Sequence, residues 1–541
     1  MPTLNWIGKD KVISHHQDVP YRVLEHKYGF TAKKGEQKEP TQSGNKIIHG
    51  DNLEALKSLL PEHEGKIDVI YIDPPYNTGN ENWVYNDNVN HPKIKKWLGE
   101  VVGKDGEDLT RHDKWLCMMY PRLKLLQKLL SNDGVIFISI DENEQANLQL
   151  MCNELFGLKN YIGRFIWKKK KQPSFLAKHI ANVTEYVFVY SKNSKLVQKL
   201  SIETVSDDTR RVDNATNEKS ERTIKKGILV KKDIHIIKAG TYKIKTMELE
   251  FLEDVLIKDN RTLNEFKVLG HFRNKQSDID LFCEEDLLFI TTNGGFRRLP
   301  TEKEKNKRKT VVDLLLDWGD NQDSDKELSL LFGKKPFDYP KPSILISNLI
   351  KSATYNKKEP LILDSFAGSG TTAHAVLNLN KQDGGNRKFI LVEMEDYAND
   401  ITAERVKRVA KGYGKDKKAV EGTGGAFDFY ELGLPLFDEN QNLNEQVGIN
   451  KIREYIWFSE TRTPFKAPKE INYFLGKKDD SVYYFIYEKN KLTTLDFDAL
   501  ELIKTKGEQY VIYADNCLLP KDFMAKNNII FKKIPRDITR F

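Results

Sequence analysis

Apolar residues recur along the chain with two spacings, one typical of strands and one typical of helices. Residues 47–48 and 67–72 are short apolar runs, and between them leucines recur at helical spacing at positions 53, 56, 59 and 60. A second series predicts a helix over 116–130 and, after Gly134, a strand over 135–140. Strands that alternate with helices predict an α/β fold with a parallel sheet.

The same alternation returns near residue 360 after a long interruption. Residues 360–363 are apolar and end at Asp364, and a glycine-rich turn, a helix over 373–379 and a strand over 389–392 follow. Residues 77–112 have no clear period, which predicts a long loop of the kind that is usually functional or disordered. Beyond residue 161, isolated charges replace the regular pattern until the alternation resumes.

These patterns divide the chain into five segments. A chain of 541 residues is also longer than a single hydrophobic core usually supports. The sequence predicts two halves of one α/β domain separated by an inserted region, with an N-terminal arm before them and a smaller strand-rich domain after them. The boundaries are 1–44 for the arm, 45–194 and 336–436 for the two halves, 195–335 for the insertion and 437–541 for the C-terminal domain.

Composition narrows the class of protein. Hydrophobic residues make up 39% of the chain, within the ordinary range for globular proteins. No apolar run approaches 18 residues and the N-terminus lacks a signal-peptide pattern, so we expect a soluble, cytoplasmic protein with no membrane contact. The four cysteines are too far apart for a Cys-x-x-Cys zinc pair, and no metal site is predicted.

The positive charge is concentrated in the middle of the chain. Residues 161–310 contain 32 Lys and Arg against 21 Asp and Glu, a net charge of +11, whereas the whole chain carries +7. Local positive charge of this kind supplies the salt-dependent part of nucleic-acid binding. Lys168, Lys169, Lys170, Lys171 and Lys178, beside Trp167 and Phe175, suit phosphate contacts and stacking, although a solvated face is the alternative.

The turn after Asp364 carries the first chemical motif. It runs Asp-Ser-Phe-Ala-Gly-Ser-Gly-Thr-Thr between a strand and a helix, and Glu393 ends the next strand. Glycines let the backbone approach a ligand closely, and an acid at the tip of the second strand can accept hydrogen bonds from ribose hydroxyls. The motif therefore predicts a nucleoside-cofactor site, with a plain strand-to-helix turn as the alternative. It matches neither the nucleotide-triphosphate loop nor the dinucleotide fingerprint.

The second motif is Asp73-Pro74-Pro75-Tyr76, which follows the strand over 67–72. Open α/β sheets bind their ligands at the carboxyl ends of strands. Two prolines remove two N–H donors, so the turn offers only acceptors, and these suit a substrate with two donors such as the exocyclic amine of a nucleobase. Tyr76 provides a ring on which a flipped base can stack. A purely structural turn is the alternative.

Together the two motifs resemble the amino-group DNA methyltransferases that use S-adenosylmethionine. The catalytic motif precedes the cofactor motif, with a large insertion between them, as in the circularly permuted β class. The resemblance extends to His49-Gly50-Asp51-Asn52-Leu53, to residues 133–141 and to Lys341-Pro342, and covers most of residues 1–435. It is most specific to the modification subunits of type III restriction-modification systems, which share the run from Asp73 to Gly79.

The resemblance implies a fold, a reaction and a set of site residues. The fold is a Rossmann-like methyltransferase sheet in permuted order, and the reaction is direct transfer of the methyl group to the N6 amine of a flipped adenine. Asp73, Pro74, Pro75 and Tyr76 would be catalytic. The cofactor-binding residues would be Asp51, Lys341, Asp364, Phe366, Gly368, Gly370, Thr371 and Glu393.

Several of these residues also have structural interpretations. Asp51 precedes a helix, where an aspartate is usually an N-cap. Pro342 can simply start a helix. Phe366 can belong to the core rather than cover a cofactor.

The resemblance also implies partners. These are double-stranded DNA, held by a target-recognition region within the insertion, a second copy of the chain, and a separate helicase-nuclease subunit. The chain shows no ATPase motif, so by itself it should modify DNA rather than cut it.

Three alternatives stay open at this point. An N4-cytosine methyltransferase uses the same amine chemistry, although that group more often has Ser in place of Asp73. A catalytically silent DNA-specificity subunit is disfavoured because both motifs are intact. A nicotinamide-dependent oxidoreductase is disfavoured because the glycine spacing does not fit.

Overall fold

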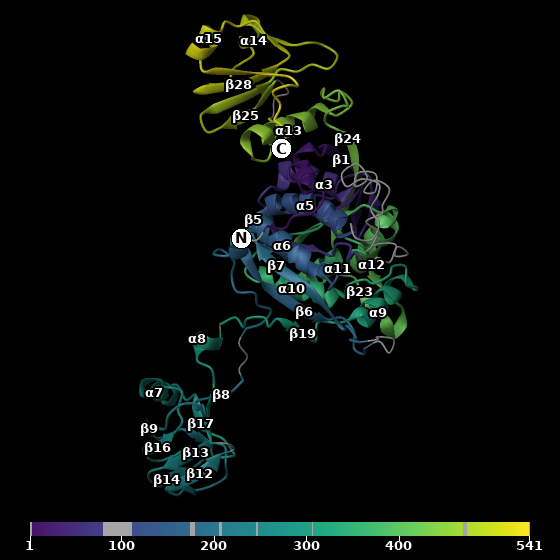
Figure 1. Ribbon diagram of the computed structural model, residues 1–541. Helices are drawn as coiled ribbons and strands as arrows, with labels where there is room; N and C mark the ends of the chain where they lie inside the picture. The colour runs from purple at the N-terminus through teal and green to yellow at the C-terminus, as the bar shows by residue number, and fades with distance from the viewer. Residues whose placement is uncertain are drawn as a thin grey trace. The chain divides into compact units, whose positions relative to one another are not determined.

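The computed structural model of the protein describes residues 3–78, 111–173, 179–204, 208–244, 247–305, 307–468 and 473–539. The chain forms two compact units, one made of Met1–Leu200 with Val312–Phe541 and the other of Ser201–Val311. Figure 1 shows both units coloured along the chain. Most of the loop predicted over 77–112, together with Lys178, lies outside the described residues.

The larger unit is built around a mixed sheet that has eleven strands within the described residues. Six neighbouring strands in its centre are all parallel. In sheet order they are β5 (Leu130–Ile140), β4 (Ile67–Ile72), β20 (Leu361–Asp364), β21 (Lys388–Glu393), β3 (Lys46–His49) and β24 (Ala426–Pro435). The predicted parallel α/β sheet is therefore confirmed.

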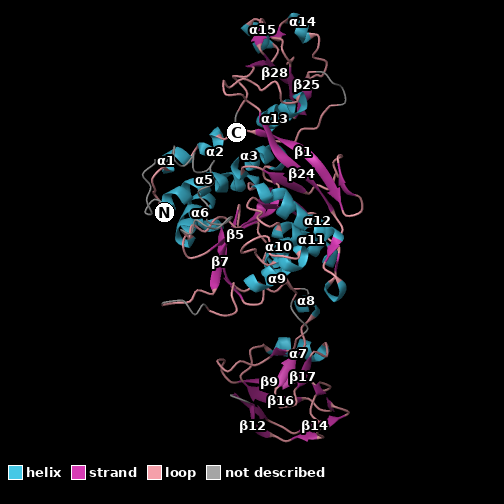
Figure 2. Ribbon diagram, turned by 90° about the vertical axis from the view of Figure 1, so that its right-hand side faces the viewer, coloured by secondary structure: helices cyan, strands magenta, loops and turns pink. Residues whose placement is uncertain are grey.

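Two groups of helices pack against this sheet. The first group is α3 (Asn52–His63), α5 (Arg111–Leu129) and α6 (Gln145–Phe156), and the second is α10 (Ser343–Thr354), α11 (Thr371–Asp383) and α12 (Glu404–Lys411). Figure 2 shows the strands of the sheet between the two groups. Helices on both faces explain why β4 and β21 read as continuous apolar runs, since side chains on both faces of these strands are buried.

The chain adds strands to the sheet in opposite directions from β4 and from β20. From β4 it continues outward to β5, whereas from β20 it continues the opposite way to β21. Val69 pairs with Ile362, and Asp364 pairs with Leu391, so the carboxyl ends of β4, β20 and β21 meet at one edge. A reversal of this kind opens a crevice at the strand ends, and ligands of open α/β sheets bind there.

The segment predicted to be an N-terminal arm is part of the sheet. β1 (Arg22–Thr31) pairs antiparallel with β24, and β2 (Gly35–Gln37) pairs with β1 at the edge. The sequence signal was weak because β1 mixes buried and exposed positions without strict alternation. Its partner strand lies about 400 positions away, so no local pattern identifies the pairing.

The other edge of the sheet contains antiparallel strands. β7 (Thr184–Ser191) lies between β5 and β6 (Tyr161–Lys168) and runs antiparallel to both. β19 (Leu314–Leu315) then pairs with β6. Because β19 and α9 (Asn321–Phe332) belong to the larger unit, the inserted unit is shorter than the predicted region 195–335.

The inserted unit has its own core of phenylalanine and aliphatic side chains, including Phe251, Phe266 and Phe296. Its first sheet contains β8 (Arg210–Arg211), β10 (Leu229–Val230), β11 (Ile236–Ile237), β14 (Val255–Lys258), β15 (Arg261–Thr262), β17 (Leu288–Ile290) and β18 (Phe296–Arg298). The second contains β9 (Ser220–Ile224), β12 (Gly240–Ile244), β13 (Met247–Phe251) and β16 (Phe266–Gly270), and α7 (Gln276–Glu284) packs against β9 and β17.

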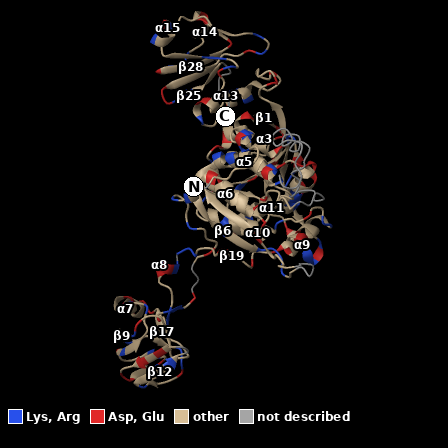
Figure 3. Ribbon diagram, viewed as in Figure 1, with Lys and Arg blue, Asp and Glu red and all other residues tan. Residues whose placement is uncertain are grey.

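The boundary of the inserted unit shows which part of residues 161–310 carries the positive charge. Residues 201–311 contain 23 Lys and Arg against 20 Asp and Glu, whereas residues 161–200 contain nine against one. Figure 3 shows positive and negative positions mixed over the inserted unit. Most of the positive excess predicted over residues 161–310 therefore belongs to the β6 and β7 edge of the larger unit and not to the inserted unit.

The C-terminal segment contains the predicted strands in a mixed arrangement. β25 (Phe474–Lys478) runs antiparallel to β26 (Ser481–Phe485), while β26, β28 (Gln509–Ala514) and β30 (Ile529–Lys533) are parallel, with α14 (Phe497–Leu500) and α15 (Lys521–Lys526) in the connections. α13 (Ile449–Thr461) joins this segment to the main core, where the rings of Tyr455 and Tyr21 lie 4.8 Å apart. Within the described residues no helix is long and apolar enough to cross a membrane.

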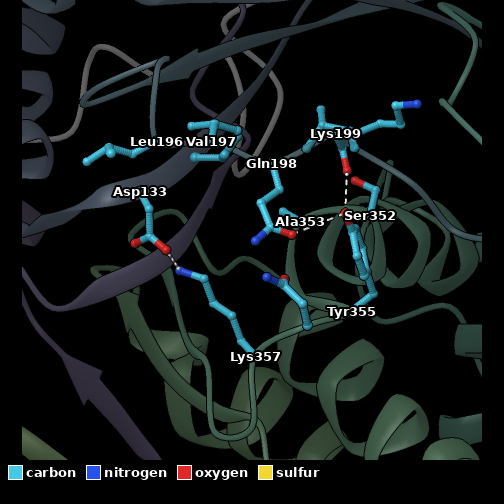
Figure 4. Close-up of a pocket in the computed structure, with 12 residues that line it drawn as sticks. Asp133, Leu196, Val197, Gln198, Lys199, Ser352, Ala353, Tyr355 and Lys357 are labelled. Carbon is cyan, nitrogen blue, oxygen red and sulfur yellow. Dashed lines mark hydrogen bonds and ion pairs between the residues drawn. The ribbon is translucent and has the colours of Figure 1, made fainter. Parts of the chain in front are cut away.

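A small hollow lies at the amino ends of the parallel strands, opposite the crevice described above. Figure 4 shows it between the segment Leu196–Leu200, which leads into the inserted unit, and the end of α10. Lys357 donates to Asp68 at 2.5 Å and to Asp133 at 2.8 Å, and the Tyr355 hydroxyl donates to the carbonyl of Lys199 at 3.0 Å. The Lys357 pairs link the segment after α10 to β4 and β5, and the Tyr355 contact holds Lys199 against the end of α10.

We expect Lys357→Ala to lower the free energy of unfolding by roughly 1–3 kcal/mol, because Asp68 would lose its charged donor in a largely buried position. Chemical denaturation measures the change. Lys358→Ala, at the exposed neighbouring position, is the matched control and should change stability little. Equal losses in the two variants would contradict the assigned role of the Lys357 ion pairs.

Candidate active site

Asp73, Pro74, Pro75 and Tyr76 leave the carboxyl end of β4 and are held firmly by neighbouring side chains. Asp73 and Tyr76 are each 7% exposed. The Tyr76 hydroxyl lies 2.8 Å from Asp73 Oδ1, and Trp115 Nε1 on α5 donates to the Pro75 carbonyl at 2.6 Å. The Pro74 carbonyl has no donor within the described residues, so it and Asp73 are the acceptors that the turn can offer.

Lys341 places a positive charge beside this turn. Its Nζ lies 2.7 Å from Asp73 Oδ2 and 5.0 Å from the centre of the Tyr76 ring. Lys341 precedes α10, and Pro342 is the N-cap residue of that helix, as its structural interpretation predicted. The ring of Tyr76 is buried beside this ammonium, so its predicted role in stacking a base stays a prediction.

Glu185 completes the charge cluster, although no sequence motif had assigned it a role. It lies on β7 and is buried, with Oε2 at 3.1 Å from the Tyr76 hydroxyl and Oε1 at 3.0 Å from Lys169 Nζ. The only signal for it was a single acid at the start of an otherwise mostly apolar strand. Its partners are distant in sequence, and no spacing rule links them.

Burial and the neighbouring charges shift the pKa values of Asp73, Glu185 and Lys341. Burial raises the pKa of Asp73, and Glu185 adds to this rise while Lys341 opposes it. Burial also acts to raise the pKa of Glu185, but Lys341 and Lys169 hold it below its ordinary value. The pKa of Lys341 is raised, because Asp73 and Glu185 outweigh the effect of its burial. The ammonium group of Lys341 is therefore charged and shared between two carboxyl groups.

The glycine-rich turn lies beside this cluster at the end of β20. Asp364 accepts from the Phe366 N–H at 3.0 Å and from the Thr372 hydroxyl at 2.5 Å, which closes the turn onto α11. Gly368 has φ +52° and Gly370 has φ +84°. A Cβ at Gly370 would lie 2.9 Å from the Thr402 carbonyl, so the turn needs glycine there.

Glu393 lies beneath the turn at the end of β21. Its carboxyl group accepts from the backbone N–H groups of Gly368, Met394 and Glu395 at 2.7 to 3.1 Å. Burial raises the pKa of Glu393 to about 8, against the effect of these donors. Burial likewise raises the pKa of Asp364 to about 7, opposed by Thr372 and by the Phe366 N–H.

Arg405 on α12 supports the turn from below and was also missed by the sequence reasoning. Its fully buried guanidinium donates to Ser369 Oγ and Thr371 Oγ1, both at 2.8 Å, and to Glu327 on α9 at 2.9 Å. The predicted site residue Thr371 is therefore held by Arg405, and its hydroxyl is 3.3 Å from the Lys341 carbonyl. This contact links the turn to the segment that carries Lys341.

One cavity of about 290 Å³ brings the two sequence motifs together. Its lining residues come from the turn after β20, from the end of β4 and from the segment before α10: Tyr71, Asp73, Phe337, Tyr339, Pro340, Lys341, Asp364, Phe366, Ala367, Gly368, Ser369, Thr371 and Thr372. Ser365, next to them, has a buried hydroxyl without a hydrogen-bond partner in the described residues. A backbone cradle, acids at two strand ends and an open hydroxyl fit a nucleoside cofactor.

Three predicted cofactor residues, Asp51, Gly370 and Glu393, are not among the residues that line this cavity, whereas Phe366 is. Asp51 caps α3 by accepting from the N–H groups of Leu53 and Glu54, and it lies 3.7 Å from Arg122. Phe366 is buried in the wall of the cavity. Of the predicted DNA-binding lysines, Lys169 pairs with Glu185 and Lys171 with Asp320 and Asp323, whereas Lys170 is exposed and Lys168 ends β6.

The raised pKa of Glu393 predicts how stability depends on pH. The folded protein keeps a proton on Glu393 that the unfolded chain releases, so this contribution is fully present below the ordinary pKa of glutamate and is lost as pH rises to about 8. Glu393→Gln should flatten the fall in unfolding free energy between about pH 5 and 8 by at most roughly 1.4 kcal/mol per pH unit. Chemical denaturation across this range measures it.

Asp396→Asn, at an exposed acid three residues later, is the control and should keep the slope of the natural protein. An unchanged slope in Glu393→Gln would show that Glu393 titrates alike in the folded and unfolded chains.

Sequence comparisons place this arrangement within a known family. The sequence model of a family of N6- and N4-type DNA methylases matches residues 67–404, which span both motifs and the insertion. The StyLTI Mod subunit, a type III restriction-modification enzyme of Salmonella typhimurium, is 32% identical over 73% of this chain and 61% of its own length. The EcoPI Mod subunit of Escherichia phage P1 is 30% identical over 76% of this chain and 68% of its own length.

The chain thus spans about two thirds or less of the length of these Mod subunits. Among solved structures, a DNA modification methylase from Thermus thermophilus, described as putative and complexed with S-adenosylmethionine, aligns with 67% of this chain and 95% of its own. Its identity is 15% and its TM-score 0.31, so the assignment depends on the sequence match instead. With both motifs inside the matched region, the chain belongs to the N6/N4 DNA methylase family.

Proposed function

We propose that the protein transfers the methyl group of S-adenosylmethionine to the N6 amine of adenine in duplex DNA. The observation that carries the proposal is the single cavity that joins Asp73 to the glycine-rich turn. One side of that cavity offers acceptors for an amine, and the other offers a backbone cradle and acids for a nucleoside. Membership of the DNA methylase family supports the same chemistry.

Asp73 and the Pro74 carbonyl act on the amine. The lone pair of an adenine amine is delocalised into the ring, so accepting its two hydrogens localises the lone pair and makes the nitrogen a better nucleophile. Burial of Asp73 removes competing water from this acceptor. S-adenosylmethionine, when bound, supplies an electrophilic methyl group on sulfur. The remaining contribution of the protein is to orient the amine in line with it.

The turn after β20 is the proposed cofactor cradle. Gly368 and Gly370 keep side chains away from the ligand. We assign the ribose hydroxyls to Glu393 at the end of β21, which lies beneath the turn and outside the lining of the cavity. Lys341 lines the same cavity beside the turn. Asp73 favours adenine over cytosine as the target, since the N4-cytosine enzymes more often have Ser at this position.

Duplex DNA would contact the β6 and β7 edge first. Residues 161–200 carry the local positive excess, and Arg164 and Lys170 are exposed there. The folded unit Ser201–Val311 would read the target sequence, since it is inserted next to this edge in the chain. The names of the relatives support a modification subunit of a type III system. A homodimer and a helicase-nuclease partner belong to this proposal only through the family resemblance of the sequence.

The cofactor site predicts the effect of a change in the turn. Gly368→Val places a branched side chain at φ +52°, so binding of S-adenosylmethionine should weaken at least roughly tenfold, in line with a strain of about 1–2 kcal/mol. Isothermal titration calorimetry measures the affinity. Gly384→Val, at φ +70° beyond the far end of α11 with nothing within 4 Å, imposes the same kind of strain away from the cavity. If both variants bind as the natural protein does, the turn is not the cofactor site.

The catalytic assignment predicts that Asp73→Ala lowers methyl transfer by roughly 10³-fold or more, while cofactor affinity changes little. The readout is mass spectrometry of nucleosides from unmethylated duplex DNA of mixed sequence after incubation with S-adenosylmethionine. The natural protein should produce N6-methyladenine. N4-methylcytosine would overturn the choice of base, and the absence of both would count against catalysis by this chain alone.

Asp141→Ala is the matched control for that experiment. Asp141 follows β5 as Asp73 follows β4, and it is similarly buried, but its carboxylate accepts from Asn143 and does not line the cavity. Transfer by this variant should stay within a few-fold of the natural protein. Full activity in Asp73→Ala would disprove the role given to Asp73.

A further inference from the structure

Two hydrogen-bond donors at the site each lie between the same two carboxyl groups. Lys341 Nζ is 2.7 Å from Asp73 Oδ2 and 3.5 Å from Glu185 Oε2. The Tyr76 hydroxyl is 2.8 Å from Asp73 Oδ1 and 3.1 Å from Glu185 Oε2. In this arrangement both oxygens of Asp73 are engaged, and Glu185 holds the longer contact with each donor.

With both of its oxygens already contacted by donors, Asp73 is a poor acceptor for a substrate amine. An ammonium group bonded to the carboxylate withdraws electron density from it and so weakens it as an acceptor. Positive charge also develops on the amine nitrogen during methyl transfer, and a second positive charge next to it would oppose this development. Catalysis would therefore gain if Lys341 moved away from Asp73 before transfer.

Lys341 cannot simply be released from Asp73 at this place. It is 7% exposed and packs between the rings of Tyr76 and Trp167, 5.0 and 6.0 Å from their centres. A buried ammonium without a carboxylate partner is strongly unfavourable. Among the described residues, Glu185 is the other acid that Lys341 contacts. A small displacement of the Lys341 Nζ would break its 2.7 Å contact with Asp73 and shorten its 3.5 Å contact with Glu185.

We propose, on the basis of the function proposed above, that Glu185 is a positioning residue that takes over Lys341 and the Tyr76 hydroxyl when Asp73 binds the substrate amine. The transfer of donors keeps the buried ammonium group of Lys341 paired with a carboxylate and frees Asp73 for the amine. Glu185 itself does not touch the reacting atoms.

Lys169 keeps Glu185 ready for this role. Its Nζ donates to Glu185 Oε1 at 3.0 Å, which leaves Oε2 for Lys341 and Tyr76. Lys341 and Lys169 also hold the pKa of Glu185 below its ordinary value despite its burial, so the acceptor stays ionised. The antiparallel course of β7 places Glu185 opposite Trp167 in β6, at the edge where β4 ends.

The test uses Glu185→Gln in the full-length chain and measures single-turnover methylation of unmethylated duplex DNA as a function of pH. The rate at neutral pH should fall by up to roughly 100-fold, the cost of an ångström-scale misplacement. The acidic limb of the pH profile should move to lower pH, because Glu185 no longer raises the pKa of Asp73 while Lys341 still lowers it. Glu185→Asp, which restores the charge, should recover part of the rate.

Binding and stability measurements separate positioning from damage to the fold. Affinity for S-adenosylhomocysteine, measured by calorimetry without any turnover, should stay within a few-fold of the natural protein. Glu460→Gln is the matched control, because Glu460 is also a largely buried acid that accepts from a tyrosine and a lysine, Tyr513 and Lys532, but lies in α13. It should keep the rate and the pH profile.

The outcomes distinguish this inference from the proposed function. If the natural protein methylates DNA and Glu185→Gln matches its rate, or loses rate with an unmoved acidic limb, the positioning role is wrong while the proposed function stands. If the natural protein binds the cofactor but methylates no DNA, the proposed function fails first. A slower rate, a shifted limb and partial recovery in Glu185→Asp together support the role.

Discussion

The parallel pairing of β4 with β20 is the constraint on which the site depends. Asp73 and Asp364 are 291 positions apart, yet hydrogen bonds between the two strands set their carboxyl ends side by side. Parallel strands need long connections, and here the connection includes a separately folded unit. The pairing is held by burial of both faces of the sheet, so the geometry of the cavity follows from the hydrophobic core rather than from the polar residues that line it.

The buried polar residues at this edge of the sheet must neutralise one another's charges. Asp73, Lys341, Glu185 and Lys169 are two acids and two bases in a buried place, and their alternation keeps each charge next to its opposite. A cluster of this kind contributes little net stability, because desolvation offsets most of the attraction. Lys341 and the Tyr76 hydroxyl instead each contact both acids, and the proposed role of Glu185 uses this property.

The glycine-rich turn is likewise held by buried charged side chains that hydrogen-bond to it. Arg405 and Glu393 approach the turn from different elements and satisfy its hydroxyl and N–H groups without covering its ligand side. α9 then supplies Glu327, which accepts from Arg405 and from the Ser343 hydroxyl at the start of α10. Because α9 directly follows β19, the chain that leaves the inserted unit leads next to the helix whose Glu327 supports Arg405 beneath the glycine-rich turn.

Local patterns in the sequence determined five of the six central parallel strands, all except β24, and both chemical motifs. Continuous apolar runs identify β4, β20 and β21, and the acids and glycines that follow them stand at strand ends whatever the neighbours are. The limits of the insertion, the joining of β1 to β24, the place of the positive charge and the parts played by Glu185 and Arg405 were decided only by the tertiary structure. Each of these depends on partners far away in the chain, and the periodicity of a single segment contains no information about which distant segment it will meet.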